Sequence, residues 1–323
     1  MNKRIVITAL VSLCVIIGCS DGGNNGLPPV ETTVRLEGSI GLSSRAVIGS
    51  GYADTLEVCF ARQDETGAGS EAYAAWNMCG AVRCGGAGNK PILFTEPQFY
   101  PVGGEAVRLH GYYPSDETKA MADAGAGHVT FLIDGATDVM ATGCISGTTY
   151  SPVRTCTFLH LLTQVGLVCY SDRAAWWGDI TGIEAVGVHT RQQLGFASAR
   201  PVLSDVSGEG EIRNIPVQEI AGLVLPEPAE GDDLPEAQGY ILLPVLPVAG
   251  TEADPLHLRV STTKDGRGNA VGTVSDVYVS VAGGFRAGSR HVITLFFTEG
   301  NHLVATEAGV EPWKEQEQGI FPI

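Results

Sequence analysis

The stretch TVRLEGSI, residues Thr33–Ile40, alternates apolar and polar side chains as a half-buried β-strand does. LEVCFAR at Leu56–Arg62 repeats this pattern and runs into the turn-rich QDETG of residues 63–67. Similar runs, rich in β-branched and aromatic residues, recur between turn signals along the chain. Further strands are expected at 106–112, 128–133, 157–168, 182–189, 240–246, 256–262, 274–281 and 291–297.

The composition agrees with an all-β protein. The chain has 42 Gly and 17 Pro among 323 residues, and long charged helices are hard to find. The sequence KDGRGN at 264–269 lies between two expected strands, and its glycines suit a hairpin loop. The strand pattern breaks near Ser171–Asp179 and restarts at Ile180. We therefore expect two β-sandwiches in tandem, at residues 46–175 and 176–323.

The first 18 residues have the features of a secretory signal peptide. Two basic residues precede an apolar run at 5–17, which is shorter than the roughly 20 residues of a membrane-spanning helix. The following IIGC at 16–19 resembles the bacterial lipobox, so Cys19 is expected to be acylated, as by palmitate. The alternative is an ordinary signal peptide cut near Gly18, with Cys19 as a free thiol. Residues 20–29 are polar and rich in Gly and Pro, which is typical of a flexible tether.

Charge and motif content exclude several functions. The formal net charge is −16, which opposes nucleic-acid binding, because that requires a basic surface. The chain has no Gly-x-Ser-x-Gly elbow that would activate a serine, so we expect neither an enzyme nor a cofactor. Carboxylate pairs of glycosidases form in space rather than along the chain, so a surface polysaccharide hydrolase stays a minor alternative. The 264–269 loop lacks the carboxylate spacing of a calcium loop, and no metal site is expected.

Three sets of residues invite a functional interpretation. His160 stands among apolar residues and is expected to be a core histidine satisfied by backbone hydrogen bonds. The pairs Trp176–Trp177 and Tyr112–Tyr113 could stack on a sugar. Adjacent residues of a strand point to opposite faces, however, so one member of each pair is expected in the core.

Besides Cys14 and Cys19 the chain has six cysteines, and an even number in an exported protein suggests disulfides. Cys79 with Cys84 and Cys144 with Cys156 are the candidate pairs, because each flanks Gly-rich sequence. The remaining two, at positions 59 and 169, lie in apolar strand patterns and could be buried thiols. Zinc is disfavoured, because paired Cys-x2-Cys knuckles are missing.

Several phrases, in this order, resemble the fimbrillin-like proteins of Bacteroidales, the subunits of type V pili. They are the lipobox at Cys19, GLSSRA at 41–46 after the first strand, DVMAT at 138–142, FLHLLTQV at 158–165, and GFRAGSRHVITL at 284–295 before Trp313. The resemblance spans nearly the whole chain. Its high cysteine content departs from the usual cysteine-poor members and argues against a close match to a particular stalk subunit.

The resemblance implies a pair of transthyretin-like β-sandwiches and a maturation route. Members travel as lipoproteins to the outer-membrane surface, an Arg-specific protease cuts them, and the first strand leaves. Here the lipidated tether and removable strand would be residues 19–45, with cleavage between Arg45 and Ala46. A donor strand of another pilus subunit then fills the vacated groove. The donor is expected in the C-terminal stretch, with candidate apolar residues Leu303, Val310, Trp313, Ile320 and Phe321.

The resemblance therefore implies a structural subunit of a cell-surface type V pilus, in the stalk or as an accessory or tip subunit, with a role in adhesion. It would be lipid-anchored in the outer membrane first and part of the fimbrium after maturation. Its partners would be related subunits and the maturation protease. The alternative is a monomeric surface-anchored lipoprotein that keeps its first strand and binds a glycan or a protein.

Overall fold

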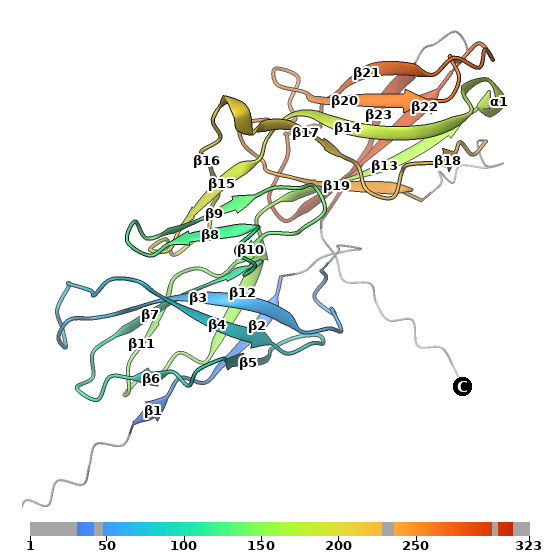
Figure 1. The fold of residues 1–323 in the computed structure, drawn as a ribbon. Helices are drawn as coiled ribbons and strands as arrows, with labels where there is room; N and C mark the ends of the chain where they lie inside the picture. Colours follow the sequence, from blue (N-terminus) through green and yellow to red (C-terminus); the bar gives the residue numbers. More distant parts are fainter. Residues whose placement is uncertain (1–30, 42–47, 228–235, 299–302, 313–323) are drawn as a thin grey trace, which may run out of the picture. The chain divides into compact units, whose positions relative to one another are not determined.

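The computed structural model describes residues 31–41, 48–227, 236–298 and 303–312, the last range by its backbone. These residues form an almost entirely β structure, in which the one α-helix, α1 (Ala174–Trp177), has four residues (Figure 1). The prediction of an all-β protein is confirmed. The expected signal peptide, Cys19, Arg45, Ala46, Trp313, Ile320 and Phe321 lie outside the described residues.

The N-terminal half is built on an eight-stranded sheet in the order β10-β12-β2-β5-β4-β3-β7-β11. β10 also pairs with β7, so the sheet closes on itself through this short strand. A separate two-stranded ladder joins β1 (Thr32–Thr33) to β6 (Phe99–Tyr100). The strands of the large sheet are β2 (Leu36–Ile40), β3 (Leu56–Asp64), β4 (Asn77–Arg83), β5 (Lys90–Phe94), β7 (Val107–Tyr113), β10 (Met140–Ala141), β11 (Ile145–Gly147) and β12 (Thr155–His160).

Two further sheets enclose a second core. One has the order β19-β13-β22-β23, and the other has the order β17-β14-β20-β21 with β18 beside β14. Apolar side chains of both sheets form one buried cluster, as in a β-sandwich. The strands are β13 (Thr163–Ser171), β14 (Asp179–His189), β17 (Ile212–Pro216), β18 (Leu223–Val224), β19 (Gly239–Leu243), β20 (Leu256–Thr262), β21 (Thr273–Val279), β22 (Ser289–Phe297) and β23 (Leu303–Pro312).

A four-stranded sheet in the order β16-β15-β9-β8 joins segments that are distant in the sequence. Its strands are β8 (Ala120–Asp123), β9 (His128–Leu132), β15 (Arg191–Gly195) and β16 (Ser204–Asp205). The pairing of β9 with β15 crosses the division expected between residues 175 and 176. β13, which precedes that division, likewise pairs with β19 and β22. The division into tandem transthyretin-like domains stays a prediction.

The strand expected at 157–168 is in fact two strands. β12 ends at His160 and β13 begins at Thr163, and they belong to different sheets. Leu161 and Leu162 between them are buried in a third core cluster, which includes Phe131 and Phe196. The apolar run carries no alternation of residue types that would mark such a break, because the exposed position 159 of β12 is a leucine and β13 is buried on both faces.

The six cysteines of the described residues are all free, so the two expected disulfides are not formed. Cys79 lies on β4 and Cys84 follows its last residue, still bonded through its backbone to Pro91. Five residues of extended chain span about 16 Å, whereas the Cα atoms of a disulfide lie within about 7 Å. Cys144 precedes β11, and Cys156 is buried on β12 beside β2.

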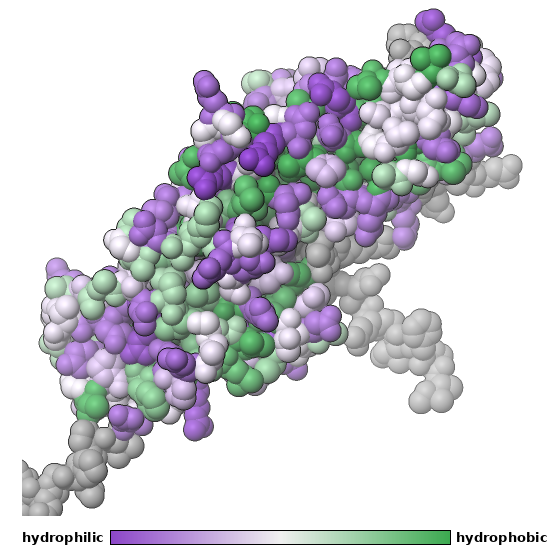
Figure 2. Space-filling model, in the orientation of Figure 1, coloured by the Kyte–Doolittle hydropathy of each residue, from purple (hydrophilic) through white to green (hydrophobic). Residues whose placement is uncertain are grey.

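The surface is mostly polar. Hydrophilic side chains cover much of the visible face, and hydrophobic ones form smaller groups among them (Figure 2). In the described ranges, no helix is long and apolar enough to cross a membrane.

Candidate functional site

The first strand of the N-terminal sheet, β2, lies inside that sheet rather than at its edge. It pairs in parallel with β12, from Glu37 opposite Thr155 to Ile40 opposite Phe158. On its other side it pairs antiparallel with β5, from Leu36 to Gly38. Figure 1 shows β2 between these two neighbours. If β2 left, both neighbours would expose unpaired backbone donors and acceptors, so we treat its place, called here the first-strand slot, as the candidate site.

The inward face of the first strand fills the N-terminal core. Val34, Leu36 and Ile40 are exposed by only 4, 3 and 4%, as the alternation of the sequence predicts. Gly38 faces inward between them, and its position has almost no room for a side chain. A Cβ atom there would lie 2.8 Å from Cδ1 of Ile92 and 3.4 Å from the Phe158 ring. The slot therefore accepts three apolar side chains and one very small residue.

Arg83 at the end of β4 is fully buried, and it bonds the backbone of the first strand. Its Nε donates to the carbonyl oxygen of Gly38 at 2.9 Å. Its two Nη atoms donate to the carbonyls of Cys84, Gly86 and Gly88, each at 3.0 Å. Burial lowers the pKa of this guanidinium. A buried cation is costly unless it is hydrogen-bonded, and here main-chain carbonyls do this.

Sequence reasoning missed Arg83, although the sequence held a signal. In NMCGAVR, residues 77–83, Cys79 and Ala81 are the inward positions, and Arg83 continues the same parity. A charged residue at an inward strand position is uncommon and indicates a specific partner.

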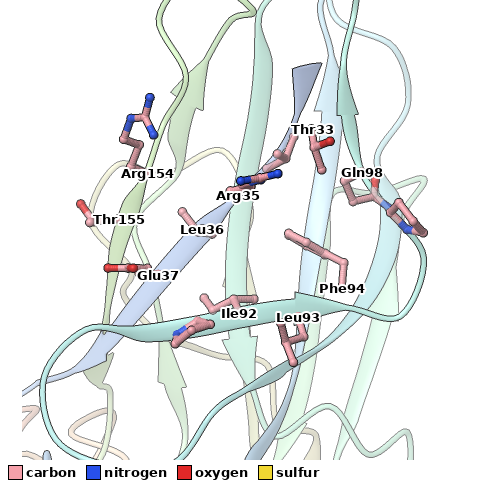
Figure 3. A pocket seen from close by; sticks show the side chains of 13 residues that line it. Thr33, Arg35, Leu36, Glu37, Ile92, Leu93, Phe94, Gln98, Arg154 and Thr155 are labelled. Atoms are coloured by element: carbon pink, nitrogen blue, oxygen red, sulfur yellow. The ribbon is translucent and has the colours of Figure 1, made fainter. Parts of the chain in front are cut away.

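A groove of about 700 Å³ opens beside the first strand. It lies between two ladders, at the gap that separates the Leu36–Ile92 pair of β2 and β5 from the Thr33–Phe99 pair of β1 and β6. At its far side the Val34 amide donates to the Gln98 carbonyl. In Figure 3, Ile92 and Phe94 reach from β5 toward Leu36, and Arg35 stands above them. The first strand is thus only partly paired on its β5 side.

His160 has a partner that sequence reasoning missed. Its Nδ1 lies 2.6 Å from Oδ2 of Asp138, and both side chains are buried. The two come together because β10, just after Asp138, pairs with β12 through Met140 and His160. Thr142 accepts a hydrogen bond from the Gly111 amide of β7 at 2.8 Å. The DVMAT phrase thus links β12 to β7 and closes the sheet.

One member of each aromatic pair is buried in the core, as expected, and the other is half-buried. Trp177 is 1% exposed, and its Nε1 donates to the carbonyl of Thr298 at 2.9 Å. Trp176 is half-buried, although both lie in a short helix rather than in a strand. Tyr112 is buried and Tyr113 is half-buried.

The 264–269 loop uses its own carboxylate internally. Asp265 accepts hydrogen bonds from the amides of Arg267 and Asn269 and from the Asn269 side chain. Among the described residues, no group of three or more His, Cys, Asp or Glu side chains is placed to hold a metal ion.

The structure places two of the five donor candidates, Leu303 and Val310, on β23. β23 is the edge strand of its sheet and pairs antiparallel with β22. The register shifts between Val292 and Ile293, whose partners are Gly309 and Glu307, so Ala308 is skipped in the ladder. The donor role of these residues stays a prediction.

Comparison with protein-family models gives no match, and comparison with curated proteins gives none either. Solved structures, in contrast, share the fold of this chain over most of its length. One, described as a putative cell adhesion protein of Bacteroides uniformis, is 14% identical with a TM-score of 0.57, covering 87% of this chain and 98% of its own. Another of the same description, from Bacteroides ovatus, is 15% identical with a TM-score of 0.54, covering 89% and 100%.

A fimbrial protein of Bacteroides vulgatus is 11% identical with a TM-score of 0.51, covering 87% of this chain and 99% of its own. The chain thus has the fold of adhesion and fimbrial proteins from Bacteroidales. This agrees with the resemblance carried by its sequence phrases.

Proposed function

We propose that this protein is a structural subunit of a cell-surface pilus and that it assembles by exchanging its first strand for a strand of another subunit. The observation that carries the proposal is the place of β2, the first strand of the large sheet, between β12 and β5. The fold shared with adhesion and fimbrial proteins supports it.

The free energy of burial favours a first-strand slot that is refilled by another strand over one that stays empty. Full burial of a Val, Leu or Ile side chain contributes about 1.5–3 kcal/mol, so Val34, Leu36 and Ile40 together contribute roughly 5–9 kcal/mol. This is comparable to the whole stability of a typical domain, about 5–15 kcal/mol. Loss of the strand also leaves two open edges. A strand from outside restores both ladders and refills the core, as in other cases of strand addition.

Release of the first strand requires a cut in the chain that follows it. Arg45, in GLSSRA at 41–46, is the proposed cleavage site, and small residues flank it. Before the cut, acylated Cys19 would hold the subunit at the outer-membrane surface. After the cut, the mature subunit would begin at Ala46 and join the fimbrium.

The test is the N-terminal sequence and intact mass of the protein recovered from the cell surface, compared between monomer and polymer fractions. We expect polymer to contain chains that begin at Ala46. Arg45→Ala should keep the first strand and remain monomeric, whereas Ser43→Ala, a neighbouring change that keeps the arginine, should assemble. Polymer built from chains that still begin at acylated Cys19 would refute the proposal. An uncut monomer would instead support the surface-anchored binding lipoprotein.

A further inference from the structure

A separate cavity of about 280 Å³ lies at one end of the N-terminal sheet, where β3 begins and β7 ends. Its walls come from the start of β3 and the residues before it, from the end of β7 and the link to β8, and from Thr137. None of the lining residues belongs to the first strand or to its neighbours β5 and β12. All of them follow Ala46, so the cavity would remain in a subunit cut after Arg45.

Two tyrosines give this cavity an aromatic wall. Tyr52 and Tyr113 both line it, and both are half-buried against the N-terminal core. Tyr113 is the last residue of β7 and pairs with Met140 of β10. Burial raises the pKa of its phenol, and the nearby Tyr52 and Asp138 add to this effect, so the hydroxyl stays protonated. Each ring thus offers an apolar face together with a hydroxyl that can donate or accept a hydrogen bond.

Two carboxylates supply hydrogen-bond acceptors at the rim of the cavity. Glu57 on β3 and Asp116 after β7 both line it and are exposed. The amide and the hydroxyl of Thr118 donate to Oδ1 of Asp116, each at 2.8 Å, and fix the orientation of this carboxylate. A carboxylate has about four lone-pair sites, so Asp116 can accept further hydrogen bonds.

Lys119 supplies a donor, and its position is also fixed by the fold. Its Nζ lies 3.2 Å from Oδ2 of Asp134 and donates to the Thr137 hydroxyl. Asp134 in turn accepts hydrogen bonds from the amides of Ala136 and Thr137 at 2.9 and 2.7 Å. The donor and acceptors of the cavity are therefore largely in place before a ligand arrives, as is usual for binding sites of small molecules.

The charges of the cavity select against ionic ligands. Glu57 and Asp116 repel an anion, and the ammonium of Lys119 is already paired with Asp134. A cation would use the carboxylates alone and would face the same ammonium. The described side chains also include no cluster of three or more His, Cys, Asp or Glu residues placed for a metal ion.

A sugar ring matches the remaining chemistry. Each hydroxyl both donates and accepts, so it can use the carboxylates and the ammonium together. The C–H groups on one face of a pyranose can stack on a tyrosine ring. Pockets for drug-sized ligands measure about 300–1,000 Å³, so a cavity of 280 Å³ suits a single ring.

We propose that this cavity binds an uncharged pyranose ring, with one face of the ring against Tyr113 and its hydroxyls hydrogen-bonded to Asp116 and Lys119. The inference goes beyond the proposed pilus function and does not depend on strand exchange. It gives the chain a ligand site of its own.

The probes are the methyl glycosides of galactose, glucose and mannose, titrated into the full chain and followed by ligand-observed NMR, which detects millimolar binding. We expect at least one of them to bind. The corresponding uronide, which carries a carboxylate in place of the hydroxymethyl group, should bind about tenfold more weakly or less. The absence of binding by all three glycosides would overturn the proposal, and so would a uronide that binds as well as its neutral counterpart.

Substitutions then locate the site. Tyr113→Ala should weaken binding of the best glycoside about tenfold, because it removes the stacking face. Tyr150→Ala is the matched control, since this tyrosine is 81% exposed and lies outside the cavity, and it should bind like the unmodified chain. Loss of binding in Tyr150→Ala but not in Tyr113→Ala would overturn the assignment.

A second variant avoids the core contact of Tyr113. Asp116→Ala changes an exposed residue and should also weaken binding about tenfold, because it removes a charged acceptor. Thermal unfolding shows whether each variant is folded, and full affinity in folded Asp116→Ala would overturn the proposal. Polymer formation tests the pilus function separately, since none of these positions lies on the first strand, β5 or β12.

Discussion

Acidification is expected to destabilise this protein through His110. This histidine lies on β7 and is fully buried, with its ring 6.0 Å from that of Phe196. Burial lowers its pKa from the ordinary value of 6.5 to about 4, and the main chain of Phe196 offsets only part of the effect. The folded protein therefore keeps this imidazole neutral where the unfolded chain would protonate it.

The sign and size of the effect follow from proton linkage. Above pH 6.5 the imidazole is neutral in both states and contributes no pH dependence. As the pH falls from 6.5 to about 4, the unfolded chain takes up the proton first, so the free energy of unfolding falls. One pKa unit corresponds to about 1.4 kcal/mol, so the full loss is about 3 kcal/mol and the loss at pH 4.5 is about 2.5 kcal/mol.

The assay is urea denaturation of the wild type and of His110→Leu at pH 8, 7, 5.5 and 4.5. Carboxylates such as Asp116, whose pKa is lowered by hydrogen bonds from Thr118, also destabilise the protein in acid. They act in both proteins, so the difference between the two pH profiles isolates His110. We expect the wild type to lose about 2.5 kcal/mol more than the variant between pH 7 and 4.5. Parallel profiles would refute the reasoning. Between pH 8 and 7, the change in the free energy of unfolding should be equal in the wild type and the variant.

Three further outcomes are expected. Gly38→Val should lower the free energy of unfolding by about 1–3 kcal/mol in urea denaturation, because it overpacks the core against Ile92. Ser39→Val on the outer face is the control, and an equal loss in both would contradict the steric argument. Trp177→Ala should cost about 3–5 kcal/mol in the same assay. The half-buried Trp176 should cost less, and the reverse order would count against the assignment of the core. Burial raises the pKa of the Cys169 thiol to about 12, so iodoacetamide at pH 8.5 should modify it only after denaturation. Modification in the native state, detected by peptide mass, would contradict this.

Strands with one buried face could be predicted from the sequence. Leu256–Thr262 was expected as a strand and is β20, where every second side chain is buried. The first strand shows the same agreement at Val34, Leu36 and Ile40. In both strands, one face meets the core and the other meets solvent, so apolar and polar residues alternate along the sequence.

The remaining features depend on contacts that a linear pattern does not contain. The break between β12 and β13 falls in an apolar run, because the exposed position 159 of β12 is also a leucine and β13 is buried on both sides, so no alternation of residue types marks it. The helix α1 has four residues, too few for a helical period. The partners Asp138 and His160 are 22 residues apart and meet because β10 pairs with β12. Only the fold brings them together.

Some features of the first-strand slot can be predicted from the sequence and others cannot, and this difference determines which strands can enter it. Its apolar positions are visible in the sequence, but the demands of Gly38 and Arg83 are not, because they arise from Ile92 and from a backbone carbonyl. Such a slot restricts the inward positions to apolar side chains and one small residue, whereas its main-chain hydrogen bonds leave the outward side chains free. Under the proposed function, donor and first strand can therefore differ at the outward positions, provided that a small residue stands where Arg83 bonds the carbonyl.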